Sequence, residues 1–313
     1  MEHRSAALDT ALTNGHPFEP IVVNRPPVRG RSMLKAVVFN AAGGRYLPQV
    51  IECLRRPPLE GAGVILLCEA GWRLKRSDGR EFAAELAAAL GMSFAFMAEF
   101  EAPCATGSPR AFMGNAILSS QPLSQADAVP LPNLFLRSWV RCMTGGPCGL
   151  TAKASFNGRA ITLGVAHLNS RWDPAGRDRQ MRDYLARFPR DGAALIGGDF
   201  NTTTVDLRTR SAIMKALRLF VAQPRRLREP ARWEPLFARL AEADFEVRGA
   251  NVHGKPTFTP SRMIPPLMRP KLDWIALRGL EPAPGSAAVV PARSSSLGRR
   301  ISDHDFVVCD IRL

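Results

Sequence analysis

The segment 194–204, Ala-Leu-Ile-Gly-Gly-Asp-Phe-Asn-Thr-Thr-Thr, contains two polar side chains whose types and spacing could do chemistry. Its apolar start is typical of a short buried strand, and Gly197 and Gly198 then allow a sharp turn. Asp199 and Asn201 follow two residues apart, so both side chains leave an extended chain on the same side. A carboxylate and a carboxamide arranged in this way could hold a water molecule or a hard cation. An Asx turn has the same local pattern, so partners elsewhere in the chain decide between the two interpretations.

Polar side chains also end other apolar runs. Asn40 and Glu69 each close a run that is typical of a buried strand, and His167 follows another. The asparagine and the histidine each have a structural interpretation, but the acid is costly to bury unless it is paired or binds a cation. Asp273 raises the same question, because it interrupts the apolar run 271–275 and needs a partner there.

These blocks, in this order, resemble those of the endonuclease/exonuclease/phosphatase superfamily, the deoxyribonuclease-I-like fold, in a bacterial-type member. The resemblance covers roughly residues 35–313, and its further motifs are Gly-Asn-Ala-Ile-Leu-Ser at 114–119, Lys-Leu-Asp-Trp-Ile at 271–275 and Ser-Asp-His at 302–304. Cys68 stands where the family usually has Gln before the acid, which leaves Glu69 in place. Lys271 and Trp274 replace the common Arg and Tyr.

The resemblance implies an α+β fold, a four-layer α/β/β/α sandwich of two packed mixed β-sheets, over residues 33–313. Residues 1–32 are polar and rich in proline and arginine, which predicts a poorly ordered N-terminal extension. The segments 224–230 and 282–298 are predicted to be loops. Hydrophobic spacing and breaker residues predict helices at 49–56, 80–90, 211–220 and 233–243.

A divalent cation is also implied by the resemblance, Mg²⁺ with Mn²⁺ as an alternative. Mg²⁺ prefers oxygen ligands and keeps several waters, which suits an acid at a strand end. The metal site is assigned to Glu69, with Asn40 and Asp303 nearby. The implied reaction is metal-assisted hydrolysis of a phosphoester, in which a water attacks in line and charge builds on the phosphoryl and leaving oxygens.

Five residues are assigned to catalysis on the same basis. Asp199 would orient and deprotonate the attacking water, and Asn201 would fix the water and the phosphate. His304 would contact the phosphate, with its ring oriented by Asp273. His167 would stabilise the phosphoryl oxygens or protonate the leaving group.

Three further residues are candidates for substrate binding. Asn115 begins the Asn-Ala-Ile-Leu-Ser run, and a purely structural interpretation as a strand-start asparagine is almost as good. Arg171 and Arg177 follow the histidine block and could clamp a phosphate, although exposed arginines are usually only solvated.

The charge of the chain favours a polyanionic partner. The formal net charge is +14 and the sequence pI is about 10.5, which suggests nucleic acid first and an anionic membrane surface second. An arginine-rich composition also accompanies a GC-rich genome, so the charge supports a phosphate substrate without proving one. No apolar run approaches the roughly 18 residues that span a bilayer, and no secretory signal or CxxC pair is present. A cytoplasmic protein without stable membrane insertion is therefore expected.

Three functions follow from these observations. The leading one is a divalent-metal-dependent phosphodiesterase that hydrolyses nucleic acid, a nuclease. The alternative is a phospholipid, sphingomyelin or inositol-phosphate hydrolase with the same chemistry, and no membrane-docking hairpin is evident in its favour. An inactive binding scaffold is disfavoured because Glu69, Asp199 and His304 are all present. The choice among DNA, RNA and other esters, and among endonucleolytic, exonucleolytic, diester and monoester cleavage, is expected to depend on the loops 101–113, 121–148, 221–235 and 254–270.

Overall fold

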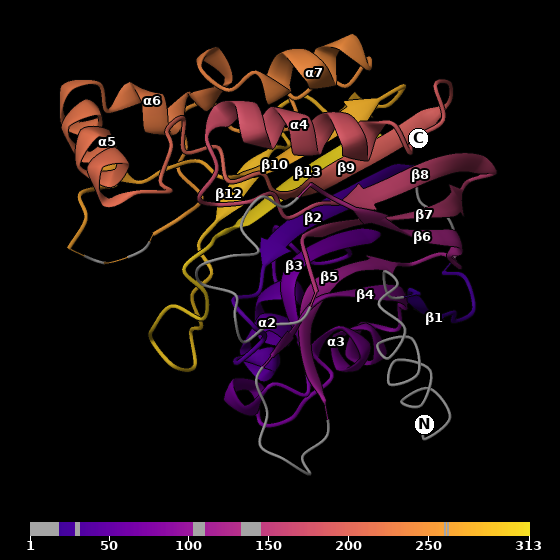
Figure 1. Cartoon of the computed structure of the whole chain (residues 1–313). Helices are drawn as coiled ribbons and strands as arrows, with labels where there is room; N and C mark the ends of the chain where they lie inside the picture. The colour runs from indigo at the N-terminus through magenta and orange to yellow at the C-terminus, as the bar shows by residue number, and fades with distance from the viewer. Residues whose placement is uncertain (1–18, 29–31, 103–109, 133–144, 260, 262) are drawn as a thin grey trace.

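The computed structural model in Figure 1 describes residues 19–28, 32–102, 110–132, 145–259, 261 and 263–313. Residues 1–18 and 29–31 of the predicted extension, and residues 103–109 and 133–144 of the loops 101–113 and 121–148, lie outside the described residues. Within the described residues, no helix combines the length and the apolar character that crossing a bilayer requires.

The larger of two sheets contains eight strands. Their order is β1 (Ile21–Val23), β4 (Ser93–Ala102), β5 (Ala111–Ser119), β3 (Val64–Trp72), β2 (Met33–Asn40), β13 (Phe306–Arg312) and β11 (Glu281–Pro282). The eighth strand, β12 (Ala288–Val290), also pairs with β13. The sheet is mixed, because β2 and β3 are parallel whereas the other pairs are antiparallel.

The smaller sheet contains five strands. Their order is β10 (Asp273–Arg278), β9 (Ala193–Asp199), β8 (Arg159–Val165), β7 (Cys148–Phe156) and β6 (Ser124–Pro130). This sheet is also mixed, because β8 and β9 are parallel and the other pairs are antiparallel.

Helices cover the outer faces of both sheets (Figure 1). On the larger sheet these are α2 (Leu47–Leu54) and α3 (Phe82–Leu90). On the smaller sheet they are α4 (Pro174–Leu185) and α7 (Leu236–Glu242), with α5 (Arg210–Ala222) and α6 (Arg225–Arg228) beside them. The described residues also form single turns of 3-10 helix, η1 (Lys75–Ser77), η2 (Pro230–Arg232) and η3 (Pro266–Met268).

The central strands are apolar throughout because both of their faces are buried. In β2, Val37 and Phe39 pack toward α2 and α3, whereas Val38 packs into the core between the sheets. In β9, Leu195 enters that same central core, and Ile196 packs with α4 and α7. Three apolar layers therefore separate four layers of secondary structure, and the predicted α/β/β/α sandwich of two mixed sheets is confirmed.

Strand direction brings the predicted site residues to one end of this sandwich. Asn40 closes β2 and Asp199 closes β9, and β9 packs against both β2 and β3 across the central core. Because β13 is antiparallel to β2 and β10 is antiparallel to β9, the first residues of β13 and β10 lie at that same end. Asp273 is the first residue of β10, and His304 comes just before β13.

Three segments differ from their predicted structure. Ile21–Val23 pairs with β4 as β1, although all of residues 1–32 were assigned to a poorly ordered extension. The predicted loop 282–298 contains β12, and the predicted loop 224–230 contains the one-turn helix α6. β1 (Ile-Val-Val) and β12 (Ala-Val-Val) are three-residue strands, and each lies in a proline-rich segment where so short an apolar run was assigned to irregular structure. Pairing with β4 and with β13 orders them.

Candidate active site

The end of β9 is a tight turn that fixes Asp199. Gly198 has a φ of 146°, and a Cβ at this position would lie 2.0 Å from the carbonyl oxygen of Ala166, so glycine is required here. Asn201 has a φ of 49°, and its backbone N–H donates to Asp199 Oδ1 at 2.9 Å, which is an Asx turn. Asn201 Nδ2 donates to the carbonyl oxygen of Leu168 at 2.7 Å. The Asx turn is therefore present and Asn201 supports Asp199 within it, while the role of Asp199 in a site stays a prediction.

Glu69 lies in a β-bulge of β3. The pairing of β3 with β5 shifts register between Leu67 and Ala70, and Glu69 has a φ of 49°. A bulge re-aims a side chain, and here it brings Glu69 Oε1 within 3.3 Å of Asn40 Nδ2. The same nitrogen donates to Asp199 Oδ2 at 3.1 Å. Asn40 therefore joins two carboxylates through its amide N–H groups.

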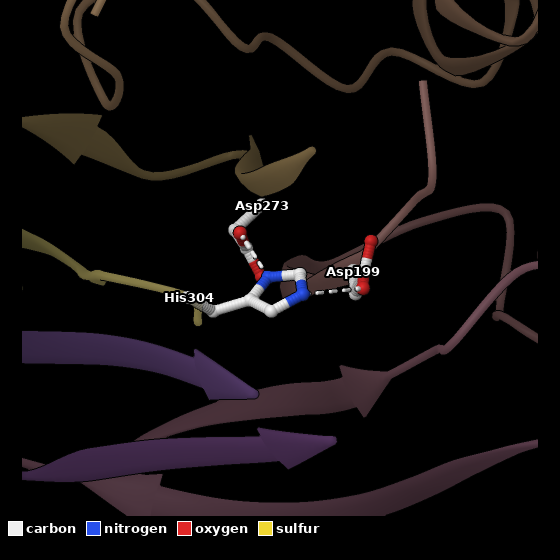
Figure 2. Close-up of side chains that lie close together, drawn as sticks. All are labelled: Asp199, Asp273 and His304. Carbon is white, nitrogen blue, oxygen red and sulfur yellow. Dashed lines mark hydrogen bonds and ion pairs between the residues drawn. The ribbon is translucent and has the colours of Figure 1, made fainter. Parts of the chain in front are cut away.

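The His304 ring lies between the carboxylates of Asp273 and Asp199 (Figure 2). Its Nδ1 is 2.8 Å from Asp273 Oδ2, and its Nε2 is 3.5 Å from Asp199 Oδ2. The backbone N–H of His304 donates to Ser302 Oγ at 3.1 Å, and the Phe258 ring lies 4.7 Å from the imidazole between centroids. Asp273 thus lies where it can orient the ring, from the first position of β10 instead of from within the strand.

A second acid–histidine pair, Glu99 and His167, was not predicted from the sequence. Glu99 lies at a bulge in β4 and is 1% exposed. Its Oε1 accepts a hydrogen bond from the backbone N–H of Cys148 at 3.1 Å, and its Oε2 is 3.7 Å from His167 Nδ1. His167 Nε2 is 3.8 Å from Asp199 Oδ2 and 4.0 Å from Glu69 Oε1. Two histidines, each backed by a buried acid, therefore present Nε2 to Asp199.

A glycine within a strand is the sequence signal that could have located both bulges. Both bulged strands pair with β5 around Gly114. A Cβ on Gly114 would lie 1.9 Å from the carbonyl oxygen of Met97, so the bulged backbone approaches β5 too closely for any other residue. An isolated glycine in a strand pattern often marks such a place, and acids on the neighbouring strands are then candidates for the site.

Burial and mutual charge set the protonation of this site. Burial raises the pKa of Asp199 to about 6, although His304 and His167 act in the opposite direction. Burial alone would lower the pKa of His304, but the charges of Asp273 and Asp199 raise it to about 10. Burial would likewise lower the pKa of His167, and its interactions with Glu99 and Asp199 raise it to about 9. At neutral pH the site therefore holds two imidazolium groups and a carboxylate that can accept a proton.

Replacing Glu99 with Gln should move the alkaline limb of the kcat/KM profile to lower pH. Glu99 helps to raise the pKa of His167 to about 9, so without its charge His167 loses its proton at lower pH. We expect a downward shift of about one pH unit, measured as kcat/KM against pH. Glu101→Gln is the matched control and should leave the limb in place. Glu101 lies two residues after Glu99 on the same strand, and its carboxylate pairs with Arg110 instead of a site residue. A limb that stays in place in Glu99→Gln would contradict this role.

The three residues assigned to a cation differ in how well each could act as its ligand. Glu69 is partly exposed, and a carboxylate is the ligand that Mg²⁺ prefers. Asn40 Oδ1 accepts a hydrogen bond from the backbone N–H of Ala42 at 3.0 Å, so Asn40 orients Glu69 with its nitrogen and does not present a free oxygen. Asp303 is exposed, and its Oδ1 is 3.4 Å from Ser302 Oγ. Glu69 is therefore the best-placed cation ligand of the three.

A different group has the tightest clustering of acid and histidine atoms. Among the described residues, Asp199, Asp273 and His304 offer ligand atoms that all lie within 4.8 Å of one another. However, His304 Nδ1 is hydrogen-bonded to Asp273, and its raised pKa keeps the ring protonated at neutral pH. A protonated imidazole repels a cation, so this cluster is better suited to proton transfer than to metal binding.

The three predicted substrate-binding residues are placed differently from one another. Asn115 is fully buried, and its Nδ2 donates to the carbonyl oxygen of Cys148 at 2.8 Å. Arg177 is also fully buried and forms an ion pair with Glu234, with Nε 3.1 Å from Oε2. The Arg177 guanidinium is committed to this buried pair and is not the exposed phosphate clamp that the sequence suggested. The role of Asn115 in substrate binding stays a prediction, because Asp199 is buried to a similar extent. Arg171 is exposed, and its role in substrate binding stays a prediction.

Comparisons with known proteins identify the family and the fold. The family model described as Endonuclease/Exonuclease/phosphatase family matches residues 37–304. A search of curated proteins found no match.

Solved structures with the same fold cover most of this chain. An endonuclease/exonuclease/phosphatase from Beutenbergia cavernae DSM 12333 is 19% identical with a TM-score of 0.63, over 90% of this chain and 72% of its own. D. rerio TDP2, complexed with single-strand DNA product, is 18% identical with a TM-score of 0.55, over 90% of this chain and 100% of its own. Sphingomyelinase C from Streptomyces griseocarneus is 16% identical with a TM-score of 0.51, over 90% of this chain and 99% of its own. At these identities the similarity shows the fold alone.

Proposed function

Since the chain belongs to the endonuclease/exonuclease/phosphatase family, whose members are phosphoester hydrolases, we propose that it is a divalent-metal-dependent phosphodiesterase that hydrolyses nucleic acid. The observation that carries this proposal is the position of Asp199. Its Oδ2 lies within 3.8 Å of Nε2 of both His304 and His167, and it shares the Asn40 amide with Glu69. A base, two proton donors and a cation ligand therefore meet at one end of the sandwich.

The side chains divide the proposed reaction among them. Asp199 orients and deprotonates the attacking water, and a pKa of about 6 suits a general base near neutral pH. His304 and His167, both protonated at neutral pH, donate to the phosphoryl oxygens as charge builds on them, or to the leaving oxygen. Asp273 and Glu99 hold the two rings from the Nδ1 side, which keeps each Nε2 directed to the reacting group.

A divalent cation would be held by Glu69, with Asn40 orienting that carboxylate and Asp303 nearby. When bound, it would neutralise charge on the phosphoryl oxygens. Asn201 contributes by holding Asp199 in place, because its backbone N–H is committed to that carboxylate and its side-chain amide to Leu168.

Basic residues next to the site support nucleic acid as the substrate. A cavity of about 590 Å³ is lined by four cationic side chains and one acid, Arg45, Lys75, Arg76, Arg80 and Asp78. It adjoins β3 at Glu69, because the N–H of Gly43 donates to the carbonyl oxygen of Glu69 at 2.9 Å and the Arg76 guanidinium packs on Gly43. Together with a net charge of +14, this cavity could track a phosphate backbone by releasing its counterions.

Hydrolysis of a substrate panel by the purified 313-residue chain tests the proposal. The panel contains single- and double-stranded DNA, RNA, sphingomyelin, an inositol polyphosphate and a bis-aryl phosphodiester, each with Mg²⁺, Mn²⁺ or EDTA. Asp199→Asn and His304→Ala are assayed in parallel. Nucleic-acid cleavage that needs the cation and is lost in both variants would support the nuclease. Turnover confined to lipid or inositol phosphates would overturn the nucleic-acid assignment, and no metal-dependent turnover would overturn the hydrolase itself.

Replacing Glu69 with Gln should raise the Mg²⁺ concentration needed for half-maximal activity by at least about tenfold, because the amide keeps the size of the side chain but removes the charge that attracts the cation. The measurement is initial rate against Mg²⁺ concentration at saturating substrate. Glu60→Gln, at an exposed position, is the control and should leave the curve unchanged. An unchanged Mg²⁺ requirement in Glu69→Gln would show that the cation is held elsewhere.

A further inference from the structure

A second basic cavity lies at the β10 edge of the smaller sheet, separate from the residues that meet at Asp199. Its volume is about 410 Å³, within the range of small-ligand pockets. The lining comes from the segments 228–232 and 247–254 and from Lys271 and Trp274. None of these residues takes part in the chemistry proposed above.

Lys271 is the buried cation of this cavity. It is 1% exposed, and its Nζ makes no hydrogen bond to the described residues. Its Nζ lies 4.4 Å from the centroid of the Trp274 ring, a cation–π contact that offsets only part of the cost of burying an ammonium group. Thr202 Oγ1 donates to the Lys271 carbonyl and accepts from Trp274 Nε1, so both lining residues are held in place.

Arginines complete the positive lining. Arg228 is partly buried, and its Nε donates to the carbonyl oxygen of Gly254 at 2.7 Å. Arg232 and Arg248 are exposed at the rim, and the one lining acid, Glu229, lies 3.7 Å from Arg232. Four cationic side chains and one carboxylate give this cavity a formal charge of 4 − 1 = +3. A buried ammonium with no hydrogen-bond partner in the part of the chain that the structure describes, surrounded by this excess of positive charge, is arranged for an anion.

We propose that this cavity binds a phosphate group at a site distinct from the hydrolytic centre. The ammonium of Lys271 would form the floor of the site, and the guanidinium of Arg228 would supply directed N–H donors. The same chemistry is offered by free inorganic phosphate and by a phosphate along a nucleic-acid strand. Lys271 is only two residues before Asp273, so a strand bound at the hydrolytic centre could place another of its phosphates here. Binding of free phosphate does not require the proposed nuclease activity.

The lysine ammonium groups report on this binding directly. The chain has only six lysines, so ¹⁵N-labelled Nζ resonances of the whole protein can be resolved and that of Lys271 assigned with Lys271→Met. Inorganic phosphate is titrated in the presence of EDTA, and a non-hydrolysable phosphorothioate oligonucleotide is titrated separately. We expect a saturable shift of the Lys271 resonance with phosphate. If Lys271→Met does not fold, single Lys→Met changes at the other five positions assign the resonance by elimination.

Three variants locate the bound phosphate. Arg228→Gln should raise the phosphate concentration that gives half of the maximal shift by at least about tenfold, because one charge-assisted hydrogen bond is lost. Arg225→Gln, an exposed neighbour in α6 that does not line the cavity, should bind as the parent does. His304→Ala should also keep the shift, because the hydrolytic centre is not required.

Two results would overturn the proposal. One is no shift of Lys271 with either saturating phosphate or the oligonucleotide, and the other is a shift lost in His304→Ala but kept in Arg228→Gln, which would assign the phosphate to the hydrolytic centre. A shift with both titrants would identify the ligand as a strand phosphate, whereas a shift with inorganic phosphate alone would identify free phosphate. Both of the latter results support the site, and neither depends on turnover.

Discussion

Replacing Asp199 with Asn is expected to lower kcat by about 10²–10⁴-fold, the contribution of a positioned general base. The amide keeps the Oδ1 acceptor for the backbone N–H of Asn201, so the turn at the end of β9 survives. It cannot take a proton, and its NH₂ group would face two other donors, Asn40 Nδ2 and His304 Nε2. The loss should therefore appear in kcat and in kcat/KM together, with little change in KM.

Asp191→Asn is the matched control for this change. Asp191 is exposed and precedes the other end of β9, so the same substitution there removes a charge without touching the site. Its activity should equal that of the parent, and circular dichroism should show that both variants are folded. An Asp199→Asn variant that is folded and retains more than about a tenth of the parent kcat would contradict the general-base role.

The dependence of kcat/KM on pH gives an independent check on the role of Asp199. The pKa of about 6 means that Asp199 gains a proton as the pH falls through that value, so parental kcat/KM should decline below about pH 6. A cation at Glu69 would move this limb to lower pH, because positive charge favours the ionised carboxylate.

The strand ends that carry the site could be predicted because their chemistry is local. A buried apolar run that closes with Asn40 or Asp199 leaves a polar group that must find a partner, and strand direction sends both ends to the same place. Glu69 was also predicted at a strand end, but it lies at a bulge within β3, which continues to Trp72. The two-sheet sandwich was implied by the resemblance to the family. The apolar runs agree with it, since strands that are apolar on both faces need covering layers on both sides.

The residues that escaped prediction depend on long-range pairing. Glu99 resembles an ordinary acid near the end of a strand. Gly114 could have indicated a bulge beside it, but the contacts of Glu99 with Cys148 and His167 come from the fold. Lys271 reads as a substitution within a family motif, and only the packing of Trp274 shows that its ammonium is buried. Spacing along the chain contains no information on either contact.

For Arg177 the sequence suggested an exposed side chain that could clamp a phosphate, whereas the structure buries it. We expect Arg177→Met to lower the free energy of unfolding by about 3–5 kcal/mol, as when a buried pair loses one member. Both partners are fully buried, and Glu234 Oε1 also accepts a hydrogen bond from the backbone N–H of Thr204 at 2.7 Å. Burial already raises the pKa of Glu234 against the opposing effect of Arg177, so the variant would leave an uncompensated carboxylate in the core.

Chemical denaturation of three variants distinguishes the structural role of Arg177 from a substrate-binding one. Arg179→Met, exposed on the same helix, should change stability by no more than about 0.5 kcal/mol. Adding Glu234→Gln to Arg177→Met should recover much of the loss, because the amide oxygen still accepts from Thr204 and the unpaired charge is gone. In Arg177→Met alone the pKa of Glu234 rises further, so its folded state binds a proton more tightly than its unfolded state, and its deficit relative to the parent should shrink as the pH falls through that raised pKa. A higher KM with unchanged stability would support a role of Arg177 in substrate binding. A loss of stability that Glu234→Gln reverses would show instead that the loss comes from the unpaired carboxylate of Glu234 in the core.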